Sequence, residues 1–184
     1  MSSSEINTKR NAIINACLEQ FVDKGLYATT SRDLSKALNL QSAGMYSYFE
    51  NKDAAVIACA EQAALKLEQQ LFAVTFNCLE KENVSLAPVK KLATQLSPMM
   101  RFFTQVCSTD KYEERMRPIL KRLSQRYKTY VVRIAQITAQ DVATVSPLVY
   151  IGITAVVNFM VYQEDNYIDP LLALIEDKLS KGEK

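Results

Sequence analysis

Apolar positions near the start of the chain recur at the spacing of an amphipathic helix. Separations of three, four and seven residues place one set of side chains on a single face: Ile14, Cys17, Leu18 and Phe21. Asn7 or Thr8 is placed to cap the start of this helix, and Lys24-Gly25 supplies the cation and the glycine that commonly end one. The pattern predicts a first helix that ends at residue 24.

Two short helices are predicted next. The first begins at Thr30, where Thr30-x-x-Asp33 has the form of a capping box with aspartate in place of glutamate. Asn39 interrupts it, and asparagine tolerates a left-handed turn better than other non-glycine residues. A third helix is expected over residues 42–49, and Asn51 is positioned to cap a fourth, much longer one.

The rest of the chain predicts long helices and no strand. Ser146-Pro147 and Asp169-Pro170 each place a capping side chain before a proline, which is typical of a helix start. Helices are therefore expected at residues 86–108, 112–139, 147–164 and 170–181.

These elements predict an all-α fold with two domains. Residues 1–53 are expected to form an N-terminal domain of three helices, and residues 54–184 a C-terminal helical domain. The long fourth helix joins them, because no flexible linker is present.

The second and third helices, with the turn between them, have the dimensions of a helix-turn-helix, in which the second helix enters the major groove. Met45 and Phe49 share one side of that helix and are expected to pack inward. Ala43 and Ser47 point the opposite way, where small side chains allow close approach to a groove floor. Gly44 costs about 1 kcal/mol of helix stability relative to alanine, and close passage beside a phosphate explains that cost.

Composition excludes several kinds of active site. The chain has no histidine, so neither a histidine-containing zinc site nor a histidine-based catalytic triad is available. We predict no enzyme activity, no cofactor and no metal. The four cysteines are scattered without a CxxC pair and indicate free thiols in a reducing compartment.

The protein is expected to be soluble and cytoplasmic, with no membrane partner. Its N-terminus lacks the apolar run of a signal peptide. The longest apolar stretch, residues 148–162, falls short of the roughly 18 residues that a membrane span needs, and Asn158 interrupts it.

Charge alone does not identify a nucleic-acid partner. The net charge is +2, and residues 1–53 carry six basic and six acidic groups. Residues 101–133 carry nine basic and three acidic groups, a net charge of +6. The basic run from Arg115 to Arg133 is open to three interpretations: a second nucleic-acid surface, a pocket for an acidic ligand, or a solvated helix face. Few cations in the N-terminal domain can neutralise phosphates, so a dimer must supply the rest.

Residues 9–55 resemble the DNA-binding region of TetR-type bacterial transcriptional regulators. The resemblance is carried by Phe21-x-x-x-Gly25-x-Tyr27, Thr29-Thr30, Leu40, Tyr46-x-x-Phe49 and Lys52-Asp53, with the spacing kept throughout. Three features depart from the usual pattern: Asn39 replaces a glycine, Gln41 replaces a capping serine, and Leu34-Ser35 replaces an Ile-Ala pair.

The resemblance implies roles for the matching positions. Phosphate contacts are implied for Thr30, Tyr46, Ser47 and Lys52. Base contacts are implied for Arg32, Gln41, Ser42 and Ala43. Arginine pairs geometrically with guanine and glutamine with adenine, and an alanine methyl can contact thymine. Tyr48 either contacts DNA or packs against the first helix.

The C-terminal domain is expected to bind a ligand and to dimerise. Candidate pocket residues are Met100, Phe103, Tyr127, Tyr130 and Asn158. The cluster at 98–106 also fits ordinary core packing, and Asn158 fits an amide paired within the protein or at an interface. The helix over 147–164 is apolar almost all round. Together with the helix over 170–181, it is expected to form a two-fold, four-helix interface with a second copy of the chain. Candidate interface residues are Gly152, Ala155, Phe159, Leu171 and Leu174.

The resemblance therefore implies a ligand-responsive, sequence-specific transcriptional regulator, with repression as the expected mode. Its partners are expected to be a double-stranded, near-palindromic DNA operator, a small-molecule effector of unknown class, and a second copy held through the last two helices. Two alternatives stay open: an enzyme in the C-terminal bundle, and a regulator that binds a protein partner instead of an operator.

Overall fold

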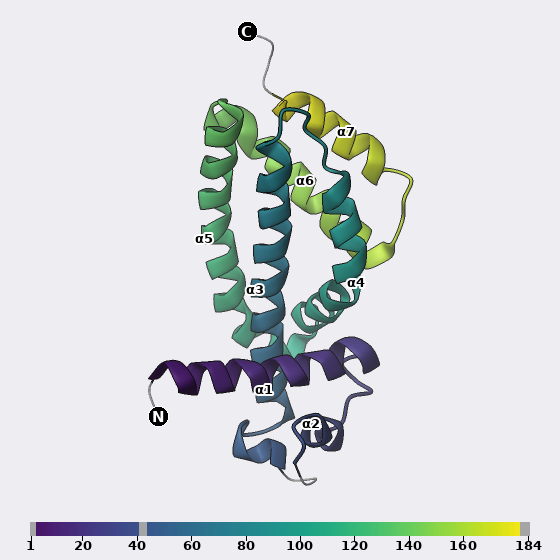
Figure 1. Cartoon of the computed structure of the whole chain (residues 1–184). Coiled ribbons are helices and arrows are strands. Elements are labelled where there is room, and N and C mark those ends of the chain that lie inside the picture. Colours follow the sequence, from purple (N-terminus) through teal and green to yellow (C-terminus); the bar gives the residue numbers. More distant parts are fainter. Residues whose placement is uncertain (1–2, 41–43, 181–184) are drawn as a thin grey trace. The chain divides into compact units, whose positions relative to one another are not determined.

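A computed structural model describes residues 3–40 and 44–180, and every regular element in these ranges is helical (Figure 1). This confirms the all-α fold class. In chain order the elements are α1 (Ser3–Lys24), α2 (Ser31–Ala37), the 3₁₀ helix η1 (Gly44–Ser47), α3 (Lys52–Leu79), α4 (Ala87–Cys107), the 3₁₀ helix η2 (Asp110–Tyr112), α5 (Glu113–Thr138), α6 (Val142–Tyr162) and α7 (Ile168–Leu179).

The chain divides into two compact units. The DNA-binding unit, as we call it below, combines residues 1–66 with 101–119, and the C-terminal unit combines 67–100 with 120–184. Helices α3, α4 and α5 therefore each contribute residues to both units. The domain boundary expected after residue 53 stays a prediction.

Two predicted helix starts are wrong, because each helix begins further upstream in the chain. Helix α1 begins at Ser3, so Asn7 and Thr8 lie inside it. Helix α6 begins at Val142 instead of after Ser146, because the Asp141 side chain accepts a hydrogen bond from Ala143 N at 3.2 Å.

Proline does not mark the starts of the last two helices either. Pro147 lies inside α6, beyond its first turn. Helix α7 begins at Ile168, so Pro170 falls within its first turn. Backbone amides in the first turn have no acceptor within the helix, so a proline there removes no helical hydrogen bond. Asn51 caps α3 as predicted, accepting a hydrogen bond from Ala54 N at 2.8 Å.

The core of the DNA-binding unit is built on α1. Leu18 and Phe21 are fully buried, as their spacing predicts. The ring of Phe21 stacks on that of Phe102, with centroids 5.2 Å apart, so the last turns of α4 belong to this core. Cys17 and Cys59 are buried free thiols whose pKa values burial raises.

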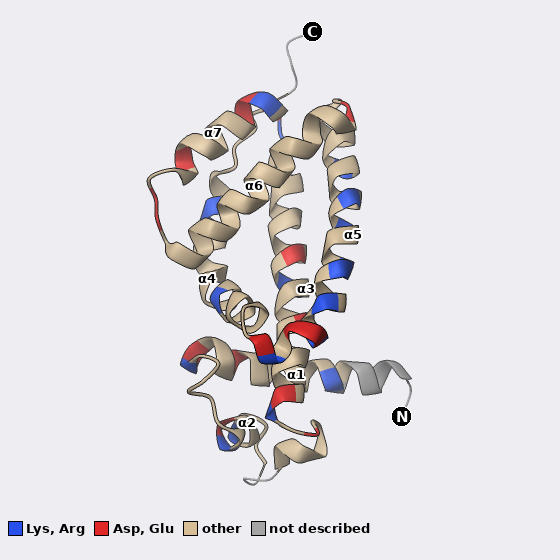
Figure 2. Cartoon of the chain, turned by 180° about the vertical axis from the view of Figure 1, so that it is seen from behind, with Lys and Arg blue, Asp and Glu red and all other residues tan. Residues whose placement is uncertain are grey.

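In the C-terminal unit, α6 and α7 lie side by side (Figure 1). Helix α6 carries no charged residue, whereas Lys and Arg recur along α5 (Figure 2). Among the described residues, α6 is the one helix long and apolar enough to cross a membrane, a test that the core helix of a soluble protein also passes.

Candidate nucleic-acid interface

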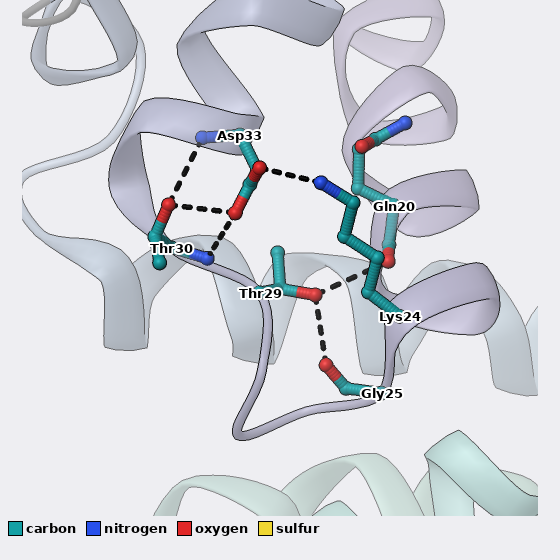
Figure 3. Close-up of polar contacts among 6 residues, drawn as sticks. All are labelled: Gln20, Lys24, Gly25, Thr29, Thr30 and Asp33. Carbon is teal, nitrogen blue, oxygen red and sulfur yellow. Dashed lines mark hydrogen bonds and ion pairs between the residues drawn. The ribbon is translucent and has the colours of Figure 1, made fainter.

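The corner between α1 and α2 is held by a glycine and a buried threonine. Gly25 follows α1 with a φ of +87°, a conformation that favours glycine. Its amide donates to Phe21 O at 2.9 Å and closes the helix. The Thr29 hydroxyl lies 2.8 Å from Gly25 O and 3.1 Å from Gln20 O, so it ties the loop back to α1 (Figure 3). The entry to α2 is thereby fixed.

The capping box at the start of α2 is confirmed (Figure 3). Asp33 N donates to Thr30 Oγ1 at 3.2 Å, and Thr30 N donates to Asp33 Oδ2 at 2.8 Å. Lys24 Nζ lies 2.5 Å from Asp33 Oδ1 and joins the end of α1 to the box. The hydrogen bond from Lys24, and then those from Thr30, lower the pKa of Asp33 well below its usual value.

Thr30→Ala is expected to lower the free energy of unfolding by about 1 kcal/mol, because the first turn of α2 loses its capping hydroxyl. Thr30→Ser, which keeps that hydroxyl, should stay close to wild type. Urea unfolding followed by circular dichroism measures both. Equal midpoints for wild type and Thr30→Ala would show that the cap contributes nothing.

The turn after α2 has the left-handed geometry predicted for Asn39. Its φ is +55°, and its amide donates to Lys36 O at 3.0 Å. Leu40 N then donates to Ser35 O at 2.9 Å. Asparagine therefore occupies the turn position at which the family that residues 9–55 resemble usually has glycine.

Ser35, one of the departures from the family pattern, has a structural role that the sequence did not reveal. Its side chain is fully buried on α2. Its hydroxyl oxygen accepts a hydrogen bond from Met45 N at 3.1 Å, ten residues along the chain. This bond fixes the first turn of η1 against α2.

Ser35→Ala is expected to cost about 1–2 kcal/mol of unfolding free energy, because the buried Met45 amide loses its partner. Ser31→Ala, at the half-buried first position of the same helix, serves as the control. Thermal unfolding of the two variants gives the comparison. If Ser35→Ala melts with Ser31→Ala and wild type, the bond does not stabilise η1.

The described part of the predicted third helix, residues 44–49, differs from the expectation. It contains the 3₁₀ helix Gly44–Ser47, where an α-helix was expected. Met45 and Phe49 are buried, as predicted from their shared side. Tyr46, Ser47 and Tyr48 are exposed, so Tyr48 does not pack into the core of α1.

Gly44 has a different explanation from the one predicted. A Cβ atom at this position would overlap the Cβ of Leu40 and lie 2.9 Å from its Cδ1. The glycine is required because the chain passes directly over Leu40, and no phosphate is needed to explain it.

The other candidate DNA contacts are placed as follows. Arg32 and Thr30 are exposed on α2. Lys52 is half-buried at the start of α3, where its Nζ donates to Leu26 O at 3.2 Å and keeps two further N–H groups. Gln41, Ser42 and Ala43 lie outside the described residues. Base contacts by these three therefore stay predictions.

Sequence reasoning missed a group that anchors the first turn of α3. Tyr112 donates to Asp53 Oδ1 at 2.8 Å, and Lys111 Nζ lies 2.6 Å from Oδ2. The Lys111 contact is the main cause of the lowered pKa of Asp53. Both partners come from η2, which is nearly sixty residues away in sequence, so no local pattern signals them.

Residues 13–59 match the family model of bacterial regulatory proteins of the tetR family. The matched segment contains the α1 core, the capped α2, the Asn39 turn, η1 and the first turns of α3. Residues 13–59 are therefore a TetR-type DNA-binding region. Proteins of the TetR family bind DNA operators and usually act as dimers with small-molecule effectors.

Two solved structures have this fold over nearly the whole chain, both described as TetR-family transcription regulators. One, from Mesorhizobium loti, is 13% identical, with 97% of this chain and 96% of that chain covered and a TM-score of 0.61. The other, from Marinobacter aquaeolei, is 15% identical, with 96% and 98% covered and a TM-score of 0.51. At such identities the likeness shows the fold alone. No curated protein is significantly similar to this chain.

The candidate ligand residues do not all belong to one unit. Met100 is buried and Tyr127 and Tyr130 are half-buried in the C-terminal unit, whereas Phe103 belongs to the DNA-binding unit. Tyr127 donates to Ser146 O at 2.9 Å. Asn158 is exposed, so it is not an amide buried within its own subunit.

The candidate interface residues divide into inner and outer sets. Ala155 and Phe159 are buried within the C-terminal unit. Gly152 is half-buried beside Ile175, and Leu171 is also half-buried. Leu174 is exposed on α7. Of these residues, Leu174 is the one whose side chain is most available to a partner.

Proposed function

We propose that this TetR-family protein is a ligand-responsive repressor that binds a near-palindromic operator as a dimer and leaves it when a small molecule binds. The observation that supports operator binding best is the division of side chains on η1. Met45 and Phe49 hold it in the core, while Tyr46 and Ser47 face outward from a turn fixed by Ser35. Such a rigid element can present polar groups to a duplex.

An outward-facing stripe on α6 supports the proposed dimer. Exposed residues recur three, four and seven positions apart along this uncharged helix: Ala143, Pro147, Tyr150, Ile151, Thr154 and Asn158. Leu174 adds an exposed apolar side chain on α7. Exposed apolar side chains gathered in this way, Tyr150 and Ile151 among them, fit an interaction surface. A second copy with the same stripe covers it with two-fold symmetry.

Ligand response is proposed to pass through the helices shared by the two units. A ligand in the C-terminal unit that favours one arrangement of α3, α4 or α5 shifts the population of DNA-binding states. The two subunits must present η1 to successive major grooves, about 34–36 Å apart, for the operator to be bound. We also place the protein in the cytoplasm, where its operator is.

Selection of bound sites from random duplexes, followed by release with candidate effectors, tests this proposal. The expected result is a near-palindromic site with half-sites one helical turn apart. Recovery of no preferred duplex, together with a protein partner captured by the exposed face of η1, would favour the protein-binding alternative. A turnover screen of the C-terminal unit addresses the enzyme alternative.

Tyr46→Phe and Lys52→Ala are each expected to weaken operator binding, because each removes a phosphate contact in both subunits. For Lys52→Ala the slope of log K against log salt should fall by about 2 per dimer. Lys91→Ala, an exposed lysine on α4, is the matched control. Gel shifts over a salt series supply the slopes. Unchanged slopes and affinities for both variants would remove these residues from the interface.

A further inference from the structure

A buried carboxylate in the C-terminal unit lacks adequate partners. Glu68 lies on α3, and its side chain is only 7% exposed. Neither carboxylate oxygen receives a well-aligned hydrogen bond from the described residues. Arg126 of α5 brings its Nε to 3.0 Å from Oε1, an ion pair without an aligned N–H. A buried carboxylate is stable only when charge and hydrogen bonds replace its lost water, and here that replacement is incomplete.

Three aromatic rings cluster on the same two helices as this ion pair. Phe72 and Phe76 follow Glu68 at four-residue intervals on α3, so all three share one side of the helix. The ring of Tyr130 on α5 stacks on Phe72 with centroids 3.8 Å apart and lies 6.0 Å from Phe76. Burial raises the pKa of Tyr130, a hydrogen bond from its hydroxyl toward the Glu68 carboxylate raises it further, and Arg126 lowers it. All three rings are half-buried, so part of each stays accessible.

Arg126 is the side chain that gives access to this cluster. Its side chain is 43% exposed, although its head group lies on the carboxylate. It also donates to the Tyr130 hydroxyl at 3.2 Å. A long, half-exposed side chain of this kind can move away at small cost, because it loses one ion pair and one hydrogen bond and regains solvent.

We propose that Glu68, Phe72, Phe76 and Tyr130 form a binding site for an organic cation that carries an aromatic group, with Arg126 as the cation that the ligand replaces. The carboxylate selects positive charge, and the ring faces favour a quaternary or tertiary ammonium. This inference rests on the proposed ligand response and names the chemistry of the effector.

Calorimetric titration of the full-length protein with benzyltrimethylammonium chloride tests the site. Neopentylbenzene, which has the same shape and no charge, should bind at least about 10-fold more weakly. Glu68→Gln should weaken binding of the cation by about 10-fold or more. Arg126→Ala should strengthen it several-fold, because the competing guanidinium is removed. A purely structural ion pair would not give this increase.

A second ion pair joins the same two helices and provides matched controls. Arg133 lies 3.2 Å from Glu80, and both side chains are about half exposed. Glu80→Gln and Arg133→Ala should leave the affinity for the cation unchanged. Absence of binding to wild type up to millimolar cation, or weaker binding by Arg126→Ala, overturns the proposal.

Operator release is measured separately, so that the two proposals can fail independently. Release of operator by the cation supports both. Binding of the cation without release keeps the site but removes it from the control of DNA binding. Release by a neutral or anionic compound, with no binding of the cation, keeps the ligand response and rejects the Glu68 site.

Discussion

Ile151→Glu is expected to convert the proposed dimer to monomers and to lower operator affinity by about 100-fold or more. Ile151 is 44% exposed in the middle of the α6 stripe, on a helix without a charged residue. In the proposed two-fold interface the glutamate of each subunit would be buried without a partner. An uncompensated buried charge costs about 3–5 kcal/mol, which is enough to dissociate a moderate dimer.

The loss of operator affinity follows from the loss of linkage between two half-sites. A dimer gains its second set of groove contacts within one molecule, an advantage of about 10²–10⁴ in affinity. The balanced charge of residues 1–53 makes this advantage more important, because one subunit has few cations for phosphates. Light scattering gives the oligomeric state, and fluorescence anisotropy with labelled operator gives the affinity.

Val132→Glu is the matched control for this prediction. Val132 lies on α5 and is 43% exposed, so it has almost the same exposure as Ile151 on a helix that already carries charge. This variant should remain a dimer and keep its operator affinity. A dimeric Ile151→Glu protein, or equal losses in both variants, would exclude the α6 stripe as the dimer interface.

The local signals of the DNA-binding unit could be predicted from the sequence because each depends on neighbouring residues. The box of Thr30 and Asp33 spans three residues, and the Asn39 turn depends on one backbone conformation. The inward side of Met45 and Phe49 follows from helical spacing alone. The partners in these interactions are only a few residues apart, so the local sequence pattern is enough to predict them.

Contacts between distant segments could not be predicted in this way. Ser35 looks like a mild replacement in a helix, yet its hydroxyl holds Met45 ten residues later. Asp53 looks like a first-turn acid, yet Tyr112 and Lys111 occupy both its oxygens. Such partners meet only after the chain has folded, and single-sequence periodicity carries no information about them.

The contact between Glu68 and α5 could not be predicted from the sequence either, although the spacing of residues on α3 gave one hint of it. An acidic residue four and eight positions before two phenylalanines is unusual on a helix face that faces a core. The sequence predicts Tyr130 as a pocket residue but does not predict Glu68, because it does not show which residues of α5 lie against α3. Placement of α5 beside that face brings the two observations together.

Gly44→Ala is expected to lower the free energy of unfolding by about 2–3 kcal/mol, near the upper end of the usual cost of overpacking. The added methyl would overlap Leu40 Cβ, an atom that cannot rotate away, so Leu40 or η1 must move. Displacement of η1 also moves exposed Tyr46 and Ser47, and operator affinity should fall more than about 10-fold. Thermal unfolding and fluorescence anisotropy measure the two effects.

Two further variants separate this clash from a general effect of replacing glycine. Gly152→Ala on α6 meets only Ile175 Cδ1, the far end of a flexible side chain, at 3.2 Å. It should be neutral or slightly stabilising, because alanine favours helix by up to about 1 kcal/mol over glycine. Leu40→Ala combined with Gly44→Ala should not restore stability, since alanine at 40 keeps the obstructing Cβ. Recovery in that double variant would show that the outer atoms of Leu40, and not its backbone-fixed Cβ, require the glycine.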